Sequence, residues 1–250
     1  ILYYQPKINL NTSEITGTEA LLRWNHPEWG VVLPERFISI AEDSGLIVSI
    51  GRWVLREACL QSKQWTDSGL PPISIAVNIS ALEFRQNNFV EGVRAILKES
   101  KLKPHCLQLE ITESVLMTDA ASSVAILNEL KKMGVMLVMD DFGTGYSSLS
   151  FLKQFPIDVL KIDRSFVHDI GTASDSGIIV SAVIGMGNNL NLMVVAEGVE
   201  HYAQLSFLKK LNCDEGQGNL FSRPVIAEEL ATLIGNNITP WPHKLSAEIY

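Results

Sequence analysis

Short apolar runs alternate with longer stretches of helical spacing along almost the whole chain, and this alternation restricts the fold more than any other feature. The apolar runs expected to form strands are residues 2–8, 18–24, 73–78, 106–111, 136–139, 159–162, 193–196 and, weakly, 217–221. The expected helices are residues 35–48, 51–65, 84–99, 120–133, 176–189 and 202–210. Repeated strand–helix units indicate a parallel sheet, and about eight of them in 250 residues is the size of a TIM-type (β/α)₈ barrel. The first two strands follow each other without a helix between them, which departs from the simple pattern.

The chain shows no internal repeat, low-complexity segment or linker, so we expect one domain over residues 1–250. Its 46% hydrophobic content is enough for a large core. The sequence starts at Ile1 without Met and enters a strand at once, which indicates a domain excised from a longer protein. Residues 236–250, which include Pro240, Trp241 and Pro242, are expected to form a tail.

Charge and cysteine content narrow the class of protein and its partners. A formal net charge of −8 argues against binding to a DNA or RNA polymer, which requires clustered Lys and Arg. Cys59, Cys106 and Cys213 are widely separated and mostly in apolar stretches, which is typical of reduced core thiols in the cytoplasm. The sequence has no apolar run of about twenty residues and no signal peptide, so we expect a cytoplasmic domain. A membrane anchor elsewhere in the parent protein is compatible with this.

Polar residues terminate most of the apolar runs. They are Glu19, Asn78, Glu110, Asp140, Asp141, Lys161, Glu197 and Gln217. In a barrel the carboxyl ends of the strands meet at one mouth, so these side chains are expected to converge. Crowded carboxylates raise each other's pKa, and a divalent cation would relieve the repulsion. Because the donors are all oxygens, without His or Cys, they suit Mg²⁺ or Mn²⁺ better than Zn²⁺.

Two adjacent aspartates end the strand at residues 136–139. Neighbouring side chains on a strand point to opposite faces, so Asp140 and Asp141 serve one site only if the chain bends. Gly143 and Gly145 would permit such a bend. The alternative is an ordinary turn in which an Asp caps the next helix. The recurrence of polar strand ends favours the site, and two adjacent carboxylates further suggest a pair of bridged ions of the kind used in phosphoryl displacement.

A set of motifs, taken together and in order, resembles the EAL-domain cyclic di-GMP phosphodiesterases over nearly the whole chain. The central motif is Glu19-Ala20-Leu21 within Glu-Ala-Leu-Leu-Arg. The others are Tyr4-Gln5-Pro6, His26-Pro27 with Pro34 and Phe37-Ile38, Val77-Asn78-Ile79-Ser80, Leu109-Glu110-Ile111-Thr112-Glu113, Asp140-Asp141-Phe142-Gly143-Thr144-Gly145-Tyr146-Ser147-Ser148, Leu160-Lys161-Ile162-Asp163 and Ala196-Glu197-Gly198-Val199-Glu200.

The resemblance implies a TIM-like (β/α)₈ barrel with one antiparallel strand, which would account for the two strands that open the chain. It also implies two Mg²⁺ or Mn²⁺ ions. Glu19, Asn78, Glu110 and Asp140 would hold the first ion. Asp140 would bridge to a second ion, which Asp141 helps to bind.

The remaining roles follow from the same resemblance. Lys161 would contact the attacking water, and Glu197 would be either the general base or a group at the second ion, so that these two and Glu19 form the catalytic set. Arg23 would pair with a substrate phosphate, Gln5 would reach a guanine edge, and Gln217 would line the site.

Further residues are expected around this set. Glu113 would brace the loop after Asp141, and Asp163 and Glu200 would support the site from outside. The family resemblance also implies a homodimer, and other domains of the same parent chain in a multidomain signalling protein.

The implied reaction is hydrolysis of one phosphodiester of cyclic di-GMP to linear 5′-pGpG, in bacterial second-messenger signalling. The alternative is an EAL domain without strong catalysis that acts as a cyclic di-GMP receptor or protein-interaction module. The complete ligand set and the intact loop at residues 140–148 favour the enzyme.

One motif departs from the family. Where the family has Gln-Gly-Tyr-x-Phe-Ser-x-Pro, this chain has Gln217-Gly218-Asn219-Leu220-Phe221-Ser222-Arg223-Pro224. Stacking of a base on an aromatic ring is worth about 1–3 kcal/mol. Asn219 is therefore expected to weaken substrate binding without affecting the metals.

Overall fold

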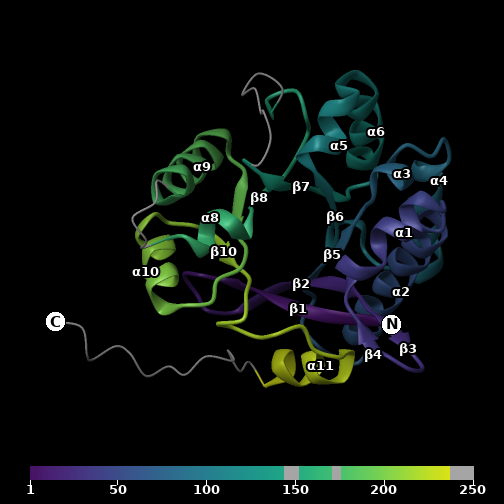
Figure 1. Cartoon of the computed structure of the whole chain (residues 1–250), viewed down its shortest axis with the longest axis horizontal. Coiled ribbons are helices and arrows are strands. Elements are labelled where there is room, and N and C mark those ends of the chain that lie inside the picture. The colour runs from purple at the N-terminus through teal and green to yellow at the C-terminus, as the bar shows by residue number, and fades with distance from the viewer. Residues whose placement is uncertain (144–151, 171–175, 237–250) are drawn as a thin grey trace.

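Eight strands form a closed barrel with helices around it (Figure 1). The computed structural model describes residues 1–143, 152–170 and 176–236. The barrel strands are β1 (Leu2–Asn9), β2 (Ile15–Leu22), β5 (Ser74–Asn78), β6 (Leu107–Thr112), β7 (Met136–Phe142), β8 (Val159–Ile162), β9 (Met193–Ala196) and β10 (Glu215–Gly216). Their order around the barrel is β1-β10-β9-β8-β7-β6-β5-β2. The predicted barrel is thus confirmed.

Strand β1 is the antiparallel member of the barrel. It pairs antiparallel with β2 on one side and with β10 on the other, whereas β2 and β5 to β10 are parallel to their other neighbours. The pairing of β1 with β2 places Gln5 opposite Glu19. The direct succession of the first two strands is therefore the origin of the antiparallel strand, as expected.

The helices form the outer layer and bury one face each against the strands (Figure 1). The longer ones are α2 (Ile47–Asp67), α4 (Phe89–Ser100), α6 (Ala120–Lys132), α9 (Ser176–Leu190), α10 (Tyr202–Lys210) and α11 (Ala227–Gly235). The shorter ones are α1 (Ile38–Asp43), α3 (Ala81–Phe84), α5 (Glu113–Thr118), α8 (Arg164–His168) and the 3₁₀ turns η1 (Pro34–Arg36) and η2 (Pro104–Cys106). On α2 the buried residues Val54, Leu55, Ala58 and Cys59 recur three and four positions apart, which is the spacing of a helix face that packs against the core.

The interior of the barrel differs between its two sides. Below the mouth, Val138, Val159 and Val195 from β7, β8 and β9 form an apolar cluster. Between β1 and β6 the interior is polar, because Lys7 Nζ donates there to Gln108 Oε1 and both side chains are buried. The polar side chains at the mouth are therefore supported by valines on one side and by a buried charge on the other.

Two of the predicted helices are broken in the structure. Residues 35–48 comprise η1, α1 and the start of α2, because Pro34 begins the 3₁₀ turn and Gly45, at φ +73°, follows the end of α1. Residues 84–99 include the end of α3, which Ser80 caps through the backbone N–H of Glu83, and most of α4. The hairpin of β3 (Trp24–His26) and β4 (Gly30–Val32) was not predicted, because the predicted strand ended at Trp24 and residues 25–34 were expected to form a loop.

The last strand was predicted at residues 217–221, but the strand that forms lies before them. The strand is β10, only two residues long, and Gln217 follows it. The chain turns away at Gly218, where a Cβ atom would lie 2.2 Å from the Val199 carbonyl oxygen. Such a short strand is held mainly by its pairing with β1 and β9, so its own sequence gives little indication that a strand forms there.

Cys59, Cys106 and Cys213 are buried free thiols, as predicted. In the described part of the chain, no helix has both the length and the apolar character needed to cross a membrane.

Candidate active site

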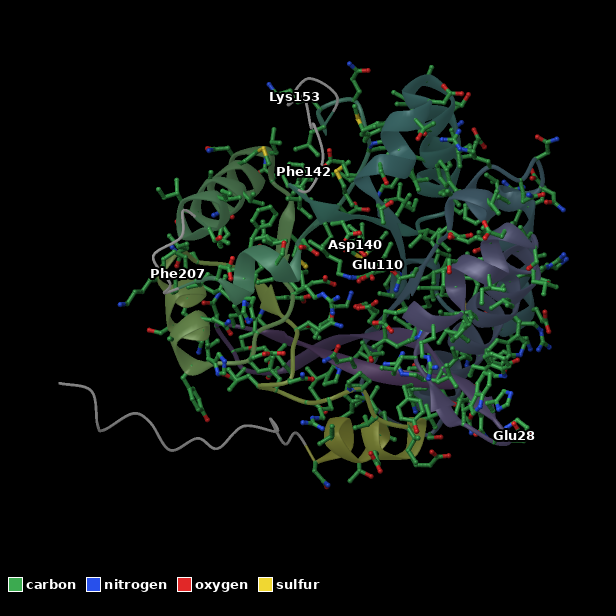
Figure 2. The ribbon with its side chains drawn as sticks, in the orientation of Figure 1. Glu28, Glu110, Asp140, Phe142, Lys153 and Phe207 are labelled. Carbon is green, nitrogen blue, oxygen red and sulfur yellow. The ribbon has the colours of Figure 1, made fainter. Side chains whose placement is uncertain are left out.

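The carboxyl ends of the parallel strands surround a pocket of about 710 Å³. Figure 2 shows Glu110 and Asp140 near the middle of the ring of strands. The pocket is lined by most of the predicted site residues, namely Gln5, Glu19, Arg23, Asn78, Asp140, Asp141, Asp163, Glu197, Glu200 and Gln217. Its volume is in the usual range for a small-molecule site.

Asp140 and Asp141 face the same site because the chain bends at Asp141. Its φ is +53°, a left-handed conformation that Asp tolerates better than most residues, and the pairing of β7 with β8 shifts register between Met139 and Phe142. The backbone N–H of Asp141 donates to Asp140 Oδ1 at 2.9 Å. The bend required by the sequence is confirmed, but Asp141 itself makes it. Gly143 follows with φ +96°, and Gly145 lies outside the described residues.

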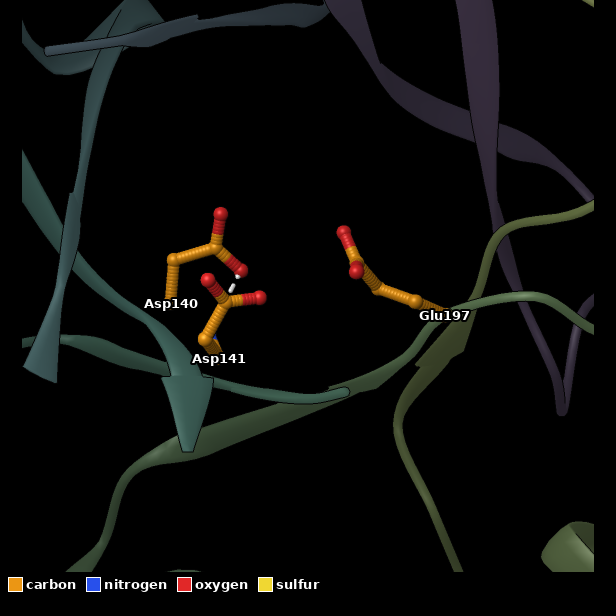
Figure 3. A group of neighbouring side chains, drawn as sticks. All are labelled: Asp140, Asp141 and Glu197. Atoms are coloured by element: carbon orange, nitrogen blue, oxygen red, sulfur yellow. Dashed lines mark hydrogen bonds between the residues drawn. The ribbon is translucent and has the colours of Figure 1, made fainter. Parts of the chain in front are cut away.

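The two aspartates lie opposite Glu197, which follows β9 (Figure 3). One carboxylate oxygen from each of Asp140, Asp141 and Glu197 lies within 4.8 Å of the others. Three oxygens at this spacing can share a cation. The Asp pair and Glu197, which are 56 or more residues apart in sequence, therefore form one acidic cluster.

Lys161 is the centre of a larger group of carboxylates. Its Nζ atom lies 2.5 Å from Glu197 Oε1, 2.6 Å from Glu110 Oε2, 3.4 Å from Asp140 Oδ1 and 3.5 Å from Glu19 Oε2. The Lys161 side chain is only 1% exposed. One buried ammonium group thus contacts carboxylates from β2, β6, β7 and the end of β9.

The local charges shift the pKa of several groups. Burial opposes the charge on Lys161, but Asp140 and Glu110 outweigh it and hold its pKa well above the ordinary value. Burial and the neighbouring Glu19 raise the pKa of Glu110 to about 7, and burial also raises the pKa of Glu197. Burial followed by Asp140 raises the pKa of Asp141 to about 6. The site therefore carries more negative groups than its ammonium groups can balance.

Glu19 is held by amide side chains. Asn78 Nδ2 donates to Glu19 Oε1 at 2.6 Å, and Gln217 Nε2 donates to Glu19 Oε2 at 2.7 Å. Gln217 Nε2 also donates to Gln5 Oε1 at 3.0 Å. Although burial opposes ionisation, Lys161 and these amides lower the pKa of Glu19. The buried Gln217 Oε1 has no hydrogen-bond partner among the described residues, so the site contains a polar atom that a ligand or water would satisfy.

Other predicted residues lie at the edge of the site. Arg23 donates to the Leu22 carbonyl and lies 5.8 Å from the ring of Tyr3. No ion pair of Arg23 occurs in the ranges that the structure describes. Asp163 caps α8 and neighbours Asp141.

The buried Glu113 Oε2 accepts the backbone N–H of Gly143 at 3.3 Å, at the start of the loop that it was expected to brace. Residues 144–148 of that loop lie outside the described residues. Glu200 is exposed and accepts from Asn219 Nδ2 at 3.4 Å, so the departure from the family motif lies at the pocket edge.

Sequence reasoning missed two polar residues beneath the site, Lys7 and Gln108. Lys7 Nζ lies 2.5 Å from Gln108 Oε1 and 3.2 Å from Glu110 Oε1. The available signal was the period of two along β1, since Lys7 and Gln5 fall on the same face of that strand.

The donor set fits hard divalent cations. Glu19, Glu110, Asp140, Asp141 and Glu197 supply five carboxylates, against the two buried ammonium groups of Lys7 and Lys161. The donors are oxygens throughout, and the surplus negative charge is what a divalent ion would offset. The fold and the site thus define a TIM-type barrel with an acidic pocket at its mouth, whose oxygen donors suit a divalent cation.

Comparison with known proteins gives the family. The model of the EAL domain matches residues 1–224, and the chain belongs to the EAL domain family. A bifunctional diguanylate cyclase/cyclic di-GMP phosphodiesterase, MucR of Pseudomonas aeruginosa, is 50% identical over 230 residues, which cover 92% of this chain and 34% of that protein. The cyclic di-GMP phosphodiesterase NbdA of the same organism is 43% identical over 90% of this chain and 29% of its own length. The chain therefore spans about a third of these curated relatives.

A solved structure described as the PaMucR phosphodiesterase in complex with c-di-GMP has a TM-score of 0.90 and 50% identity. The match covers 92% of this chain and 93% of that one. The EAL domain of Mycobacterium smegmatis DcpA has a TM-score of 0.79 and 36% identity, with 95% and 96% covered. EAL phosphodiesterases are metal-dependent, which agrees with the acidic cluster found here.

Proposed function

We propose that this domain hydrolyses one phosphodiester bond of cyclic di-GMP and releases linear 5′-pGpG. The observation that carries the proposal is the convergence of four carboxylates on Lys161 Nζ, within 3.5 Å, at the mouth of the barrel. Membership of the EAL domain family and the nucleotide named in the related solved structure supply the substrate class.

The site residues fit two ions of Mg²⁺ or Mn²⁺. Glu19, Asn78, Glu110 and Asp140 would hold one ion, and Asp140 with Asp141 would hold the other. When bound, the ions make a water molecule more acidic and neutralise charge on the reacting phosphate. The left-handed bend at Asp141 supports this assignment, because it turns adjacent carboxylates toward one site.

The protein groups around the reacting atoms divide the remaining work. Lys161 keeps its proton and orients the attacking water by donating to it. Glu197 has a raised pKa and contacts Lys161 at 2.5 Å, which suits a group that takes up the proton of that water. Because Glu197 also belongs to the cluster with Asp140 and Asp141, a role at the second ion is the alternative.

Substrate contacts come from the pocket edge. Arg23 has no ion pair among the described residues and lines the pocket, so it is suited to a phosphate of the substrate. Gln5 and Gln217 are joined by a hydrogen bond and would contact the guanine side of the nucleotide. Glu113, Asp163 and Glu200 would hold the loop and the rim in place.

The wider assembly is part of the proposal. The relatives matched here are about three times longer, so we propose that the domain works within a longer signalling protein. We also propose a homodimer, which the resemblance of the motifs to the family implies. The parent chain would supply any attachment to a membrane.

The test is incubation of the purified domain with cyclic di-GMP, with and without Mg²⁺ or Mn²⁺, with pGpG followed by chromatography. Glu19→Ala should abolish product formation, whereas the exposed Glu14→Ala should leave it unchanged. Nucleotide that binds but returns uncut, in the presence of metal, would contradict the proposal and identify a receptor.

A further inference from the structure

Lys7 is a buried lysine inside the barrel, to which neither the sequence motifs nor the proposed chemistry gives a role. Its side chain is 0% exposed, and it lies on β1 two residues after Gln5. A buried ammonium group is costly unless it is paired and hydrogen-bonded. A lysine at this position therefore needs specific partners.

Its partners are two neighbouring side chains of β6. Lys7 Nζ donates to Gln108 Oε1 at 2.5 Å and to Glu110 Oε1 at 3.2 Å. Gln108 and Glu110 are two residues apart on the strand, so both point into the barrel. Glu110 is the one carboxylate that forms an ion pair with Lys7 in the part of the chain that the structure describes.

The two oxygens of Glu110 have different partners. Oε1 contacts Lys7, while Oε2 contacts Lys161 at 2.6 Å among the carboxylates of the site. The Glu110 carboxylate is 0% exposed, so both contacts are shielded from bulk solvent. Lys7 thus fixes the rotation of the carboxylate and directs Oε2 toward the acidic cluster.

Elsewhere the barrel interior is packed without a charged side chain. There Val138, Val159 and Val195 fill the interior with apolar atoms. Lys7 does not line the pocket, and its ammonium group is held by Gln108 and Glu110. Its position is explained by its contact with Glu110.

We propose that Lys7 is a positioning residue of the metal centre, which holds Glu110 through Oε1 and so presents Oε2 to a bound ion. The inference rests on the proposed function in one respect, that Glu110 is a metal ligand. Side chains that orient metal ligands from behind typically contribute roughly tenfold to a hundredfold in metal affinity.

The test is a Mn²⁺ titration of the metal-free domain, in which free Mn²⁺ is measured by electron paramagnetic resonance. Lys7→Met should weaken the tighter site by roughly tenfold to a hundredfold. The matched control is Lys131→Met, which removes a lysine paired with Asp158 away from the pocket. This control should bind Mn²⁺ within about twofold of the wild type.

A second readout separates positioning from a general structural defect. At saturating Mn²⁺, the KM of Lys7→Met for cyclic di-GMP should return to within about threefold of the wild-type value, since Lys7 is not expected to touch substrate. Should Lys7→Met fail to fold by circular dichroism, Lys7→Gln is titrated instead, and at least a threefold loss of affinity is expected because its neutral amide is shorter.

Mn²⁺ affinity within about twofold of the wild type in the folded variant would overturn the proposal. So would a KM defect that saturating Mn²⁺ leaves in place. A wild-type domain that binds Mn²⁺ yet leaves cyclic di-GMP intact would contradict the proposed reaction, while the titration would still decide the role of Lys7.

Discussion

Lys161 Nζ and Glu197 Oε1 lie 2.5 Å apart, although Lys161 lies on β8 and Glu197 follows β9. The same Nζ atom contacts Glu110 at 2.6 Å. In the absence of metal, Lys161 is thus the cation that holds the carboxylates of the mouth together, and its removal has consequences for both catalysis and stability.

Lys161→Met should lower kcat by about a hundredfold or more, because the water loses a charged donor and the carboxylates lose their common partner. The metal-free variant should also unfold at lower urea concentration than the wild type. Steady-state kinetics and urea unfolding measure the two effects, and the exposed Lys132→Met is the control. Unchanged kcat would refute a catalytic role for Lys161.

Glu83 makes the free energy of unfolding depend on pH, independently of the acidic cluster. Burial raises its pKa to about 7, from an ordinary value of 4.5. Between these pH values the Glu83 carboxyl is protonated in the folded state and ionised in the unfolded state. The contribution of Glu83 to the free energy of unfolding is therefore fully present below pH 4.5 and is lost as the pH rises to about 7. The loss amounts to about 3 kcal/mol.

Glu83→Gln should remove this dependence. Urea unfolding between pH 4.5 and 8 measures the free energy of unfolding of both proteins. The value for the variant should rise relative to the wild type as the pH rises, and the difference should become constant above about pH 7. The exposed Glu28→Gln is the control and should follow the wild type. Parallel curves for Glu83→Gln and the wild type would show that burial of this carboxyl is without energetic consequence.

Asp141 has both a backbone and a charge role, and two substitutions separate them. Asp141→Asn keeps a residue that tolerates φ +53° and should fold with nearly wild-type stability. Asp141→Val places a β-branched residue there and should lose about 1–2 kcal/mol more. Both should lose affinity for the second ion. Equal stability of Asn and Val variants in urea would contradict the assigned strain.

Asn219→Tyr restores the ring of the family motif at the pocket edge. The variant should lower the KM for cyclic di-GMP by roughly fivefold, equivalent to about 1 kcal/mol of base stacking, with kcat little changed. Asn219→Gln, which keeps an amide, controls for loss of the contact with Glu200. If the Tyr and Gln variants have the same KM, stacking at this position is not the missing interaction.

The barrel could be predicted because its strands carry a strong local pattern. Runs such as Val159–Ile162 and Met193–Ala196 are apolar, bounded and spaced by helices, and both strands occur as expected. The same pattern placed the acidic residues at one mouth. The motifs then indicated the family over nearly the whole chain.

The remaining features depend on contacts that are distant in sequence. Strand β10 is defined by its partners β1 and β9, so Gln217 was assigned to a strand that it only follows. Lys7 was missed because a lone lysine in a strand is normally assigned to the surface, whereas barrel closure buries this one beside Glu110. A bend after Asp140 was predicted, but it was assigned to Gly143 and Gly145, whereas Asp141 itself makes it.

The left-handed conformation of Asp141 means that the proposed ligand of the second ion and the strained bend of the backbone are the same residue. Asp141→Gly would remove an oxygen donor but would also remove the backbone strain, so the loss of catalysis would be accompanied by a smaller loss of stability. Loss of Glu110 would have the opposite effect, since it would strand two buried lysines. We therefore expect that family members that have lost the reaction replaced the aspartate at the position of Asp141 earlier than the buried glutamate at the position of Glu110.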